Sequence, residues 1–96
     1  SQQFRTDIGR IDILAKDKFD GSHVVIELKR NQTSDDTVGQ VTRYMGWIQD
    51  KLDDKNVKGI IVAGSYDEKL FYAQKMLKNI EVFLYEVNFK LNEYKR

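Results

Sequence analysis

The sequence contains no cysteine and only one histidine, His23, among its 96 residues. Without cysteine the chain can form no disulfide, no zinc ribbon and no thiol nucleophile. A single histidine argues against a multi-histidine metal site and against a serine–histidine–aspartate triad. The chain also has no proline, an absence from which nothing follows.

Long apolar runs and a strong net charge are missing as well. No segment approaches the ~20 apolar residues that span a bilayer, and no signal peptide opens the chain, so we expect a cytoplasmic protein with no membrane partner. The net charge of +1 argues against a purely electrostatic nucleic-acid binder, although it leaves room for a local basic groove. The hydrophobic fraction of 41% and the charged fraction of 32% fit one globular domain, or a piece of one, with a modest core.

The first half of the chain is predicted to form a β-hairpin. Residues 3–6 can end a strand, and residues 7–9 form a turn. Residues 10–16 (RIDILAK) and 23–30 (HVVIELKR) then have the composition of two strands. Asp20-Gly21 between them is a hairpin turn signal.

The second half is predicted to alternate helices and strands. A polar loop in which Thr33 or Ser34 can act as N-cap leads into an amphipathic helix. Its apolar residues recur at spacings of three and four: Val38, Val41, Met45, Ile48 and Leu52. The remaining elements are, in order, a strand at 57–63, a helix from a Ser65/Glu68 capping box to about Lys78, and a strand at 80–89. The predicted fold class is α/β, with a mixed, partly antiparallel central sheet flanked by helices.

Opposite charges stand inside the most apolar strand, VVIELKR. Alternation along a strand places Glu27 and Lys29 on one face. Any hairpin loop with an even number of residues adds Asp12 to that face. If the turn is Asp20-Gly21, Asp12 lies opposite Lys29; if it centres on Phe19-Asp20, Asp12 lies opposite Glu27.

Two interpretations of this charge cluster remain open from the residues alone. One is a cross-strand salt bridge on a solvated face, which would stabilise by ~0–1 kcal/mol and leave Glu27 a bystander. The other is a divalent cation, because two neighbouring carboxylates repel each other and Mg²⁺ binds one or two carboxylates with water. The strand begins apolar on both faces, which favours a covered central strand and hence the second interpretation. Lys29 beside a metal could hold a water or neutralise a developing charge.

Residues 9–47 resemble the PD-(D/E)XK nuclease superfamily, and more closely the C-terminal catalytic domain of NucS/EndoMS-type endonucleases and their RecB-like relatives. The signature of that family is an Asp in one strand, Glu-x-Lys in the next, and a helix with Gln followed four residues later by Tyr. The matching positions here are Asp12, Glu27-Leu28-Lys29, Gln40 and Tyr44. The segment KGIIVAG, with the helix and strand after it, also resembles the family, so the match covers nearly the whole chain.

The resemblance implies a restriction-endonuclease-like core and a role for each matching residue. Asp12, Glu27 and the backbone carbonyl of Leu28 would bind Mg²⁺ or Mn²⁺, and Lys29 would orient or activate the attacking water. Gln40 and Tyr44 would contact the site or the scissile phosphate, and they lie off the apolar stripe of their helix. Arg30 and Arg43 are candidate phosphate contacts. The alternatives are ordinary packing for Tyr44 and Trp47, and a solvated surface for the two arginines.

The expected function is a metal-dependent endonuclease that hydrolyses phosphodiester bonds in DNA. The alternative is a non-catalytic nucleic-acid-binding or assembly module that retains the nuclease fold. Family members usually begin with a helix that packs on the sheet, and this chain has no room for it. We therefore expect residues 1–96 to be a single nuclease-like domain, either a fragment of a longer protein or an isolated catalytic domain, with an N-terminal domain of the same protein as a candidate partner. An uncovered sheet face favours self-association, and cutting both strands favours a homodimer.

Overall fold

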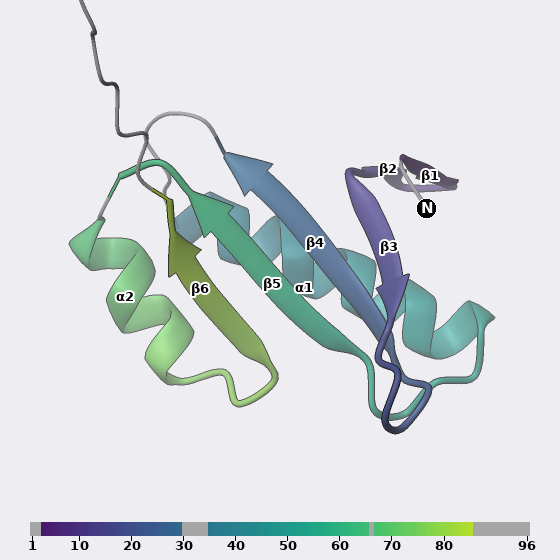
Figure 1. The fold of residues 1–96 in the computed structure, drawn as a ribbon. Helices are drawn as coiled ribbons and strands as arrows, with labels where there is room; N and C mark the ends of the chain where they lie inside the picture. Colours follow the sequence, from purple (N-terminus) through teal and green to yellow (C-terminus); the bar gives the residue numbers. More distant parts are fainter. Residues whose placement is uncertain (1–2, 30–34, 66, 86–96) are drawn as a thin grey trace, which may run out of the picture.

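A four-stranded mixed sheet, two helices and a separate two-stranded hairpin make up the fold (Figure 1). The computed structural model describes residues 3–29, 35–65 and 67–85. The elements are β1 (Phe4–Thr6), β2 (Gly9–Ile11), β3 (Ile13–Lys16), β4 (His23–Lys29), α1 (Asp35–Lys51), β5 (Lys58–Ala63), α2 (Glu68–Lys75) and β6 (Ile80–Leu84). The predicted α/β fold, a mixed central sheet with flanking helices, is confirmed.

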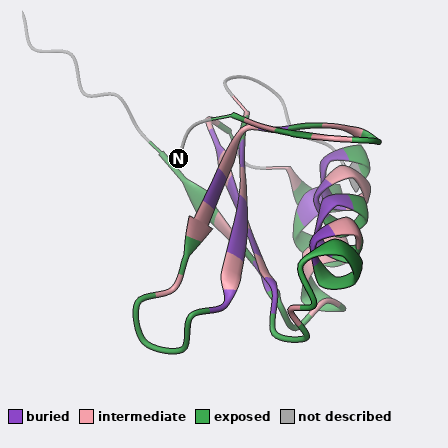
Figure 2. Ribbon diagram, turned by 90° about the vertical axis from the view of Figure 1, so that its right-hand side faces the viewer, coloured by how far each residue is buried: buried purple, intermediate pink, exposed green. Residues whose placement is uncertain are grey.

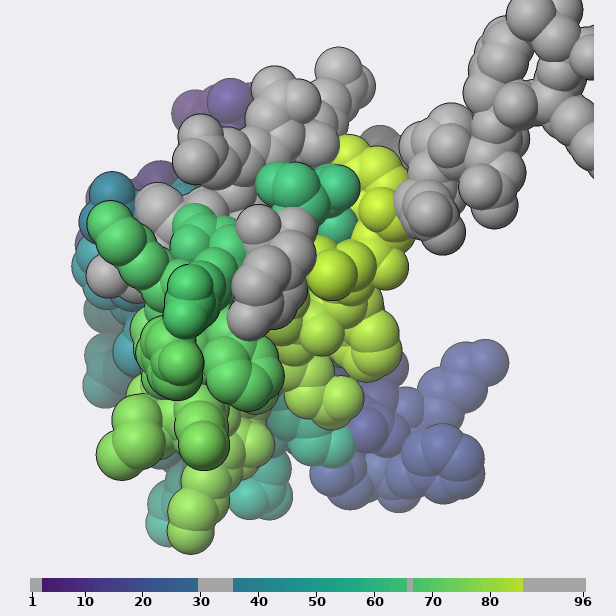
Figure 3. Space-filling view, turned by 90° about the vertical axis from the view of Figure 1, so that its left-hand side faces the viewer, coloured from purple at the N-terminus to yellow at the C-terminus, as the bar shows by residue number. Residues whose placement is uncertain are grey.

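The sheet has the strand order β3-β4-β5-β6. β3 pairs with β4 antiparallel, whereas β4, β5 and β6 are parallel to one another. Two successive right-handed crossovers in the same direction place α1 and α2 on the same face of the sheet, where they contact each other. Figure 2 shows α1 against that face, and Figure 3 shows α2, in green, beside β6, in yellow-green.

Helix α1 approaches β5 closely at Gly59. A Cβ added there would lie 2.7 Å from both Met45 Sδ and Val41 Cγ1. We predict that Gly59→Ala lowers the free energy of unfolding by about 1–3 kcal/mol, because the helix must shift to admit the methyl group. Urea denaturation measures this. Gly46→Ala is the matched control, because nothing lies within 4 Å of a Cβ at that position. Alanine has the higher helix propensity, so this variant should gain up to ~1 kcal/mol of stability. A loss of stability equal to that of Gly59→Ala would contradict the packing explanation.

The prediction of one strand over residues 10–16 is wrong, because the chain bends at Asp12. β2 pairs with β1, and only β3 joins the main sheet. Ile11 and Leu14 are both buried in the core. Residues three apart cannot share a face of one strand with a period of two, so the backbone breaks alternation between them. The break in alternation lies at Asp12, so β2 and β3 belong to different sheets.

Of the two hairpin registers considered from the sequence, the structure has the one that places Asp12 opposite Glu27. Ile13 lies opposite Ile26, and Lys16 opposite His23, as expected for a turn centred on Phe19-Asp20. The Asp20-Gly21 signal is part of a longer loop over residues 17–22. That loop closes where Gly21 donates its backbone N–H to Asp17 O over 2.9 Å, with Gly21 at φ +75°.

Two helix boundaries differ from the prediction. The N-cap of α2 is Asp67, whose carboxylate accepts the backbone N–H of Lys69, so the Ser65/Glu68 capping box is wrong. A carboxylate directly before the first turn also suits the positive end of the helix dipole. The helix ends at Lys75 rather than near Lys78, because Asn79 O must accept from Gly59 N before β6 begins. Thr33, Ser34 and the segment after residue 85 lie outside the described residues.

The face of the sheet opposite α1 is open in the part of the chain that the structure describes (Figure 2). Ladder register places apolar side chains there, all partly or largely exposed: Ile13, Ile26, Leu28, Ile60, Val62 and Phe83. Self-association through this face stays a prediction. Across residues 3–29, 35–65 and 67–85, no helix has the length and apolar character needed to cross a membrane.

Candidate active site

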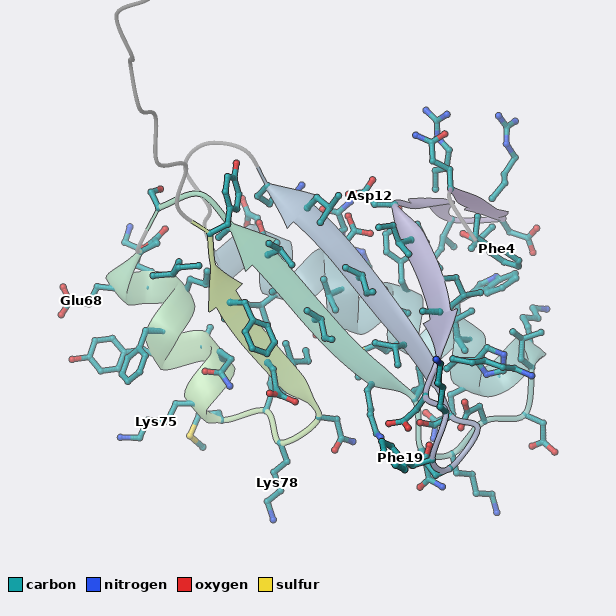
Figure 4. The ribbon with its side chains drawn as sticks, in the orientation of Figure 1. Phe4, Asp12, Phe19, Glu68, Lys75 and Lys78 are labelled. Carbon is teal, nitrogen blue, oxygen red and sulfur yellow. The ribbon has the colours of Figure 1, made fainter. Side chains whose placement is uncertain are left out.

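The bend at Asp12 brings its carboxylate beside that of Glu27. Figure 4 shows Asp12 next to β3, at the edge of the sheet. Because Ile13 lies opposite Ile26, the same register places Asp12 opposite Glu27. Two hydrogen bonds join the segments where the regular ladder has ended. The backbone N–H of Leu28 donates to Asp12 Oδ2 over 3.0 Å, and the backbone N–H of Asp12 donates to Glu27 Oε1 over 3.4 Å. The two carboxylates are therefore held from both strands.

Glu27 is a buried acid, with 1% of its surface exposed. Burial raises the pKa of its carboxyl group to about 7, and the hydrogen bond and repulsion from Asp12 add to the rise. The Asp12 N–H and the charge of Lys29 oppose it. Burying a carboxylate next to another carboxylate lowers stability unless a positive charge compensates. The pair is thus not a salt bridge, and its two carboxyl groups could serve as ligands of a divalent cation.

Strand geometry indicates a third oxygen, the backbone carbonyl of Leu28, on the side of β4 where Asp12 lies. Lys29 O accepts from Gly64 N at 3.0 Å, so the Lys29 carbonyl is directed toward the β5 side. Since carbonyl directions alternate along a strand, that of Leu28 is directed toward Asp12, on the side where its own N–H donates. Two carboxylates, one carbonyl and water are a ligand set that fits Mg²⁺. No group of three or more His, Cys, Asp or Glu that could hold a metal exists among the described residues, so any ion here would keep several waters.

Lys29 and Gln40 meet beside the carboxylates. Lys29 Nζ donates to Gln40 Oε1 over 3.3 Å, which links the end of β4 to helix α1. A neutral amide orients the ammonium group without cancelling its charge. The ammonium has two further N–H donors. Lys29 thus can hold a water or an anionic oxygen next to the pair of acids.

Tyr44 and Trp47 join α1 to the β1–β2 hairpin. Tyr44 is 6% exposed, and its hydroxyl oxygen occupies the space that a Cβ on Gly9 would fill. Gly9 has φ +140°, which L side chains rarely adopt. Trp47 packs edge to face on Phe4, with ring centroids 6.1 Å apart. This contact between Gly9 and Tyr44 was not predicted from the sequence, in which Gly9 resembles an ordinary turn residue.

The two arginines named from the sequence differ in status. Arg43 is exposed on α1, three residues after Gln40, with its guanidinium group over Gly39. Arg30 lies outside the described residues. The structure therefore brings together Asp12, Glu27, Lys29 and Gln40, places Tyr44 against the hairpin, and leaves Arg43 at the surface.

Comparison with known proteins gives consistent matches over nearly the whole chain. The model of the endonuclease NucS C-terminal domain matches residues 1–94. Endonuclease NucS of Sulfolobus acidocaldarius is 34% identical over 92 residues, which cover 96% of this chain and 34% of that protein. Endonuclease NucS of Methanocaldococcus jannaschii is 35% identical over 78 residues, covering 81% of this chain and 28% of the relative. The chain thus spans about a third of the length of these curated relatives.

Solved structures agree with these matches. A repair endonuclease from Pyrococcus abyssi superposes with a TM-score of 0.74 at 33% identity, covering 90% of this chain and 37% of that one. The structure of an EndoMS–dsDNA complex superposes with a TM-score of 0.69 at 29% identity, covering 93% and 38%.

Proposed function

Since the chain belongs to the family of endonuclease NucS C-terminal domains, we propose that it is a metal-dependent endonuclease domain that hydrolyses phosphodiester bonds in DNA. The observation that carries the proposal is the pairing of Asp12 with the buried Glu27 at the end of β4. Two adjacent acids, one of them buried, lower the stability of the metal-free fold, whereas neighbouring carboxylates are ligands that Mg²⁺ binds. The relatives' names supply the reaction class, because each is called an endonuclease.

Each residue of the site would have its own role in such a reaction. Asp12, Glu27 and the Leu28 carbonyl would hold Mg²⁺ or Mn²⁺, which when bound supplies an acidified water and offsets charge on the phosphoryl oxygens. Lys29 would hold the attacking water through an N–H of its ammonium group and offset negative charge that develops on the phosphoryl oxygens. Gln40 keeps the Lys29 ammonium group at the site through their hydrogen bond. Arg43 would meet a phosphate at the exposed side of α1.

Double-stranded DNA is the substrate that we propose. The support is the relative whose structure is a complex of EndoMS with dsDNA. A bare domain of this size carries the chemistry rather than the choice of DNA structure, so we assign that choice to further segments of a longer protein. Cutting both strands would take two such sites, which a homodimer provides.

Metal-dependent cleavage tests the proposal. The 96-residue chain is incubated with plasmid and linear duplex DNA in Mg²⁺, Mn²⁺ or EDTA, and Mn²⁺ binding is measured by calorimetry. We expect cutting with either metal and none in EDTA. Asp12→Asn should lose cutting by at least about 100-fold and should weaken Mn²⁺ binding.

Asp50→Asn is the matched control, because it makes the same chemical change at an exposed position of α1. It should bind Mn²⁺ and cut DNA as the unaltered chain does. Mn²⁺ binding that Asp12→Asn leaves unchanged would refute the metal site. Intact DNA binding without any cutting would instead favour the non-catalytic module.

A further inference from the structure

The β1–β2 hairpin places two arginines directly opposite each other. Arg5 and Arg10 are Cα partners in the antiparallel ladder, and both are exposed. Directly opposed residues of an antiparallel pair project from the same side, with Cβ atoms about 5 Å apart. The hairpin therefore presents two guanidinium groups together on one face.

Neither guanidinium group is neutralised within the described part of the chain. No carboxylate of residues 3–29, 36–65 or 67–85 lies within ion-pair distance of Arg5 or Arg10. The described partner of Arg10 is Gln3, whose Oε1 accepts from Nη1 over 3.1 Å and adds no charge. Asp7 in the turn makes no ion pair with either arginine. Two like charges directly opposite each other destabilise an antiparallel strand pair. An anionic ligand that binds both guanidinium groups would offset this repulsion.

The opposite face of the hairpin is fixed against the domain. Phe4 packs on Trp47, and Ile11 is completely buried. The Tyr44 hydroxyl group abuts Gly9. These contacts hold the hairpin on α1 and turn Arg5 and Arg10 away from it, so the arginines have a fixed position relative to the acids.

That position is next to the candidate active site. Arg10 precedes Asp12 by two residues, so their Cα atoms are at most about 7 Å apart. β2 also contacts β4, and Figure 4 shows the hairpin beside Asp12. A shallow hollow of about 360 Å³ is lined by Arg5, Thr6, Gly9 and Arg10. Successive phosphates of a duplex strand advance about 3.4 Å along the helix axis, so phosphates adjoining one at Asp12 fall within reach of this hollow.

We propose that Arg5 and Arg10 form a docking site for the DNA backbone, binding a phosphate close to the one that is cleaved. The proposal rests on the proposed function, because DNA is the anion it names. Arginine suits the role, since its planar guanidinium group can donate two parallel hydrogen bonds to a phosphate. The contact fixes where the strand lies without reading its sequence.

Fluorescence anisotropy with a labelled duplex of random sequence tests the docking site. All chains carry Lys29→Ala, and Mg²⁺ is present, so that the DNA stays intact. We expect the Arg5→Gln/Arg10→Gln pair to raise the Kd about 10-fold near 0.1 M salt and to lower the slope of log K against log salt by about 2. Arg5→Lys/Arg10→Lys should retain most of the affinity, because it keeps both charges.

Lys75→Gln/Lys78→Gln is the matched control, since it also removes two positive charges but at the far end of the molecule (Figure 4). It should change the Kd by less than about 2-fold. An equal loss in both double variants, or no loss in the arginine variant, overturns the docking site while leaving the nuclease proposal standing. If the parent chain binds no duplex at low salt, the proposed function and the docking site fall together. Circular dichroism confirms that each variant is folded.

Discussion

Replacing Lys29 with alanine should abolish DNA cleavage and leave the fold intact. The ammonium group is the only cation that the described contacts place beside Asp12 and Glu27, so its loss removes the N–H donor that would hold the attacking water and the positive charge that would offset the developing negative charge. Loss of a positioned donor that stabilises charge in the transition state typically slows a reaction by 10²- to 10³-fold, and we expect a fall of at least about 100-fold. Rates of plasmid nicking in Mg²⁺ measure it.

Stability should hardly change in the same variant. Lys29 is half-buried, and the contact it loses is one side-chain hydrogen bond to Gln40, a bond that contributes about 1 kcal/mol. Lys55→Ala is the control, because Lys55 is an exposed lysine in the turn between α1 and β5, and it should cut at the normal rate. Undiminished cleavage by Lys29→Ala would remove Lys29 from the reaction and with it the proposed mechanism.

The placement of the acids could be predicted in part because strand alternation is a local property. Glu27 and Lys29 share a face for that reason alone. Which residue of β4 lies opposite Asp12 depends on the loop between β3 and β4. A turn at Asp20-Gly21 and a turn centred on Phe19-Asp20 both fitted the sequence. The choice between them came from the six-residue loop closed by Asp17 and Gly21, which a two-residue turn pattern does not represent.

The bend at Asp12 could not be predicted, because RIDIL fits a single alternating strand as well as two short ones. What decides between them is tertiary: Ile11 and Leu14 are both needed in the core. The contact between Tyr44 and Gly9 is of the same kind, since it joins positions far apart in sequence. Such contacts determine where the hairpin with Arg5 and Arg10 lies relative to the site, and the periodicity of the sequence does not predict them.

Glu27→Gln should stabilise the metal-free fold at pH 8 while abolishing metal binding. In the unfolded chain the carboxyl group titrates near 4.5, whereas in the fold its pKa is about 7. Folding therefore disfavours the charged form. The contribution of Glu27 to stability is greatest below pH 4.5, falls as the pH rises to about 7, and stays low above that. The deficit above pH 7 is about 3 kcal/mol, and glutamine, which carries no charge, should not suffer it.

Three other acids have lowered pKa values. The pKa of Asp20 is lowered to about 2 by hydrogen bonds from Ser22 and Lys58, and those of Asp17 and Asp54 are lowered by hydrogen bonds from Lys58 and from His23. Groups with lowered pKa values lose their stabilising effect as the pH falls below the ordinary carboxyl range. A loss of stability between pH 5 and 7 in EDTA that is present in the unaltered chain and absent from Glu27→Gln is therefore assigned to Glu27.

Urea unfolding at pH 5 and pH 8, in EDTA and in Mn²⁺, measures these changes. Glu81→Gln, at an exposed position of β6, is the matched control and should follow the unaltered chain. Mn²⁺ should stabilise the unaltered chain at pH 8, because a ligand of the folded state raises the free energy of unfolding, and should leave Glu27→Gln unchanged. A Glu27→Gln chain that is less stable than the unaltered one in EDTA at pH 8 would mean that Glu27 is a structural residue. The opposite result would show an acid that lowers the stability of the empty fold, which is expected of a metal ligand and not of a salt-bridge partner.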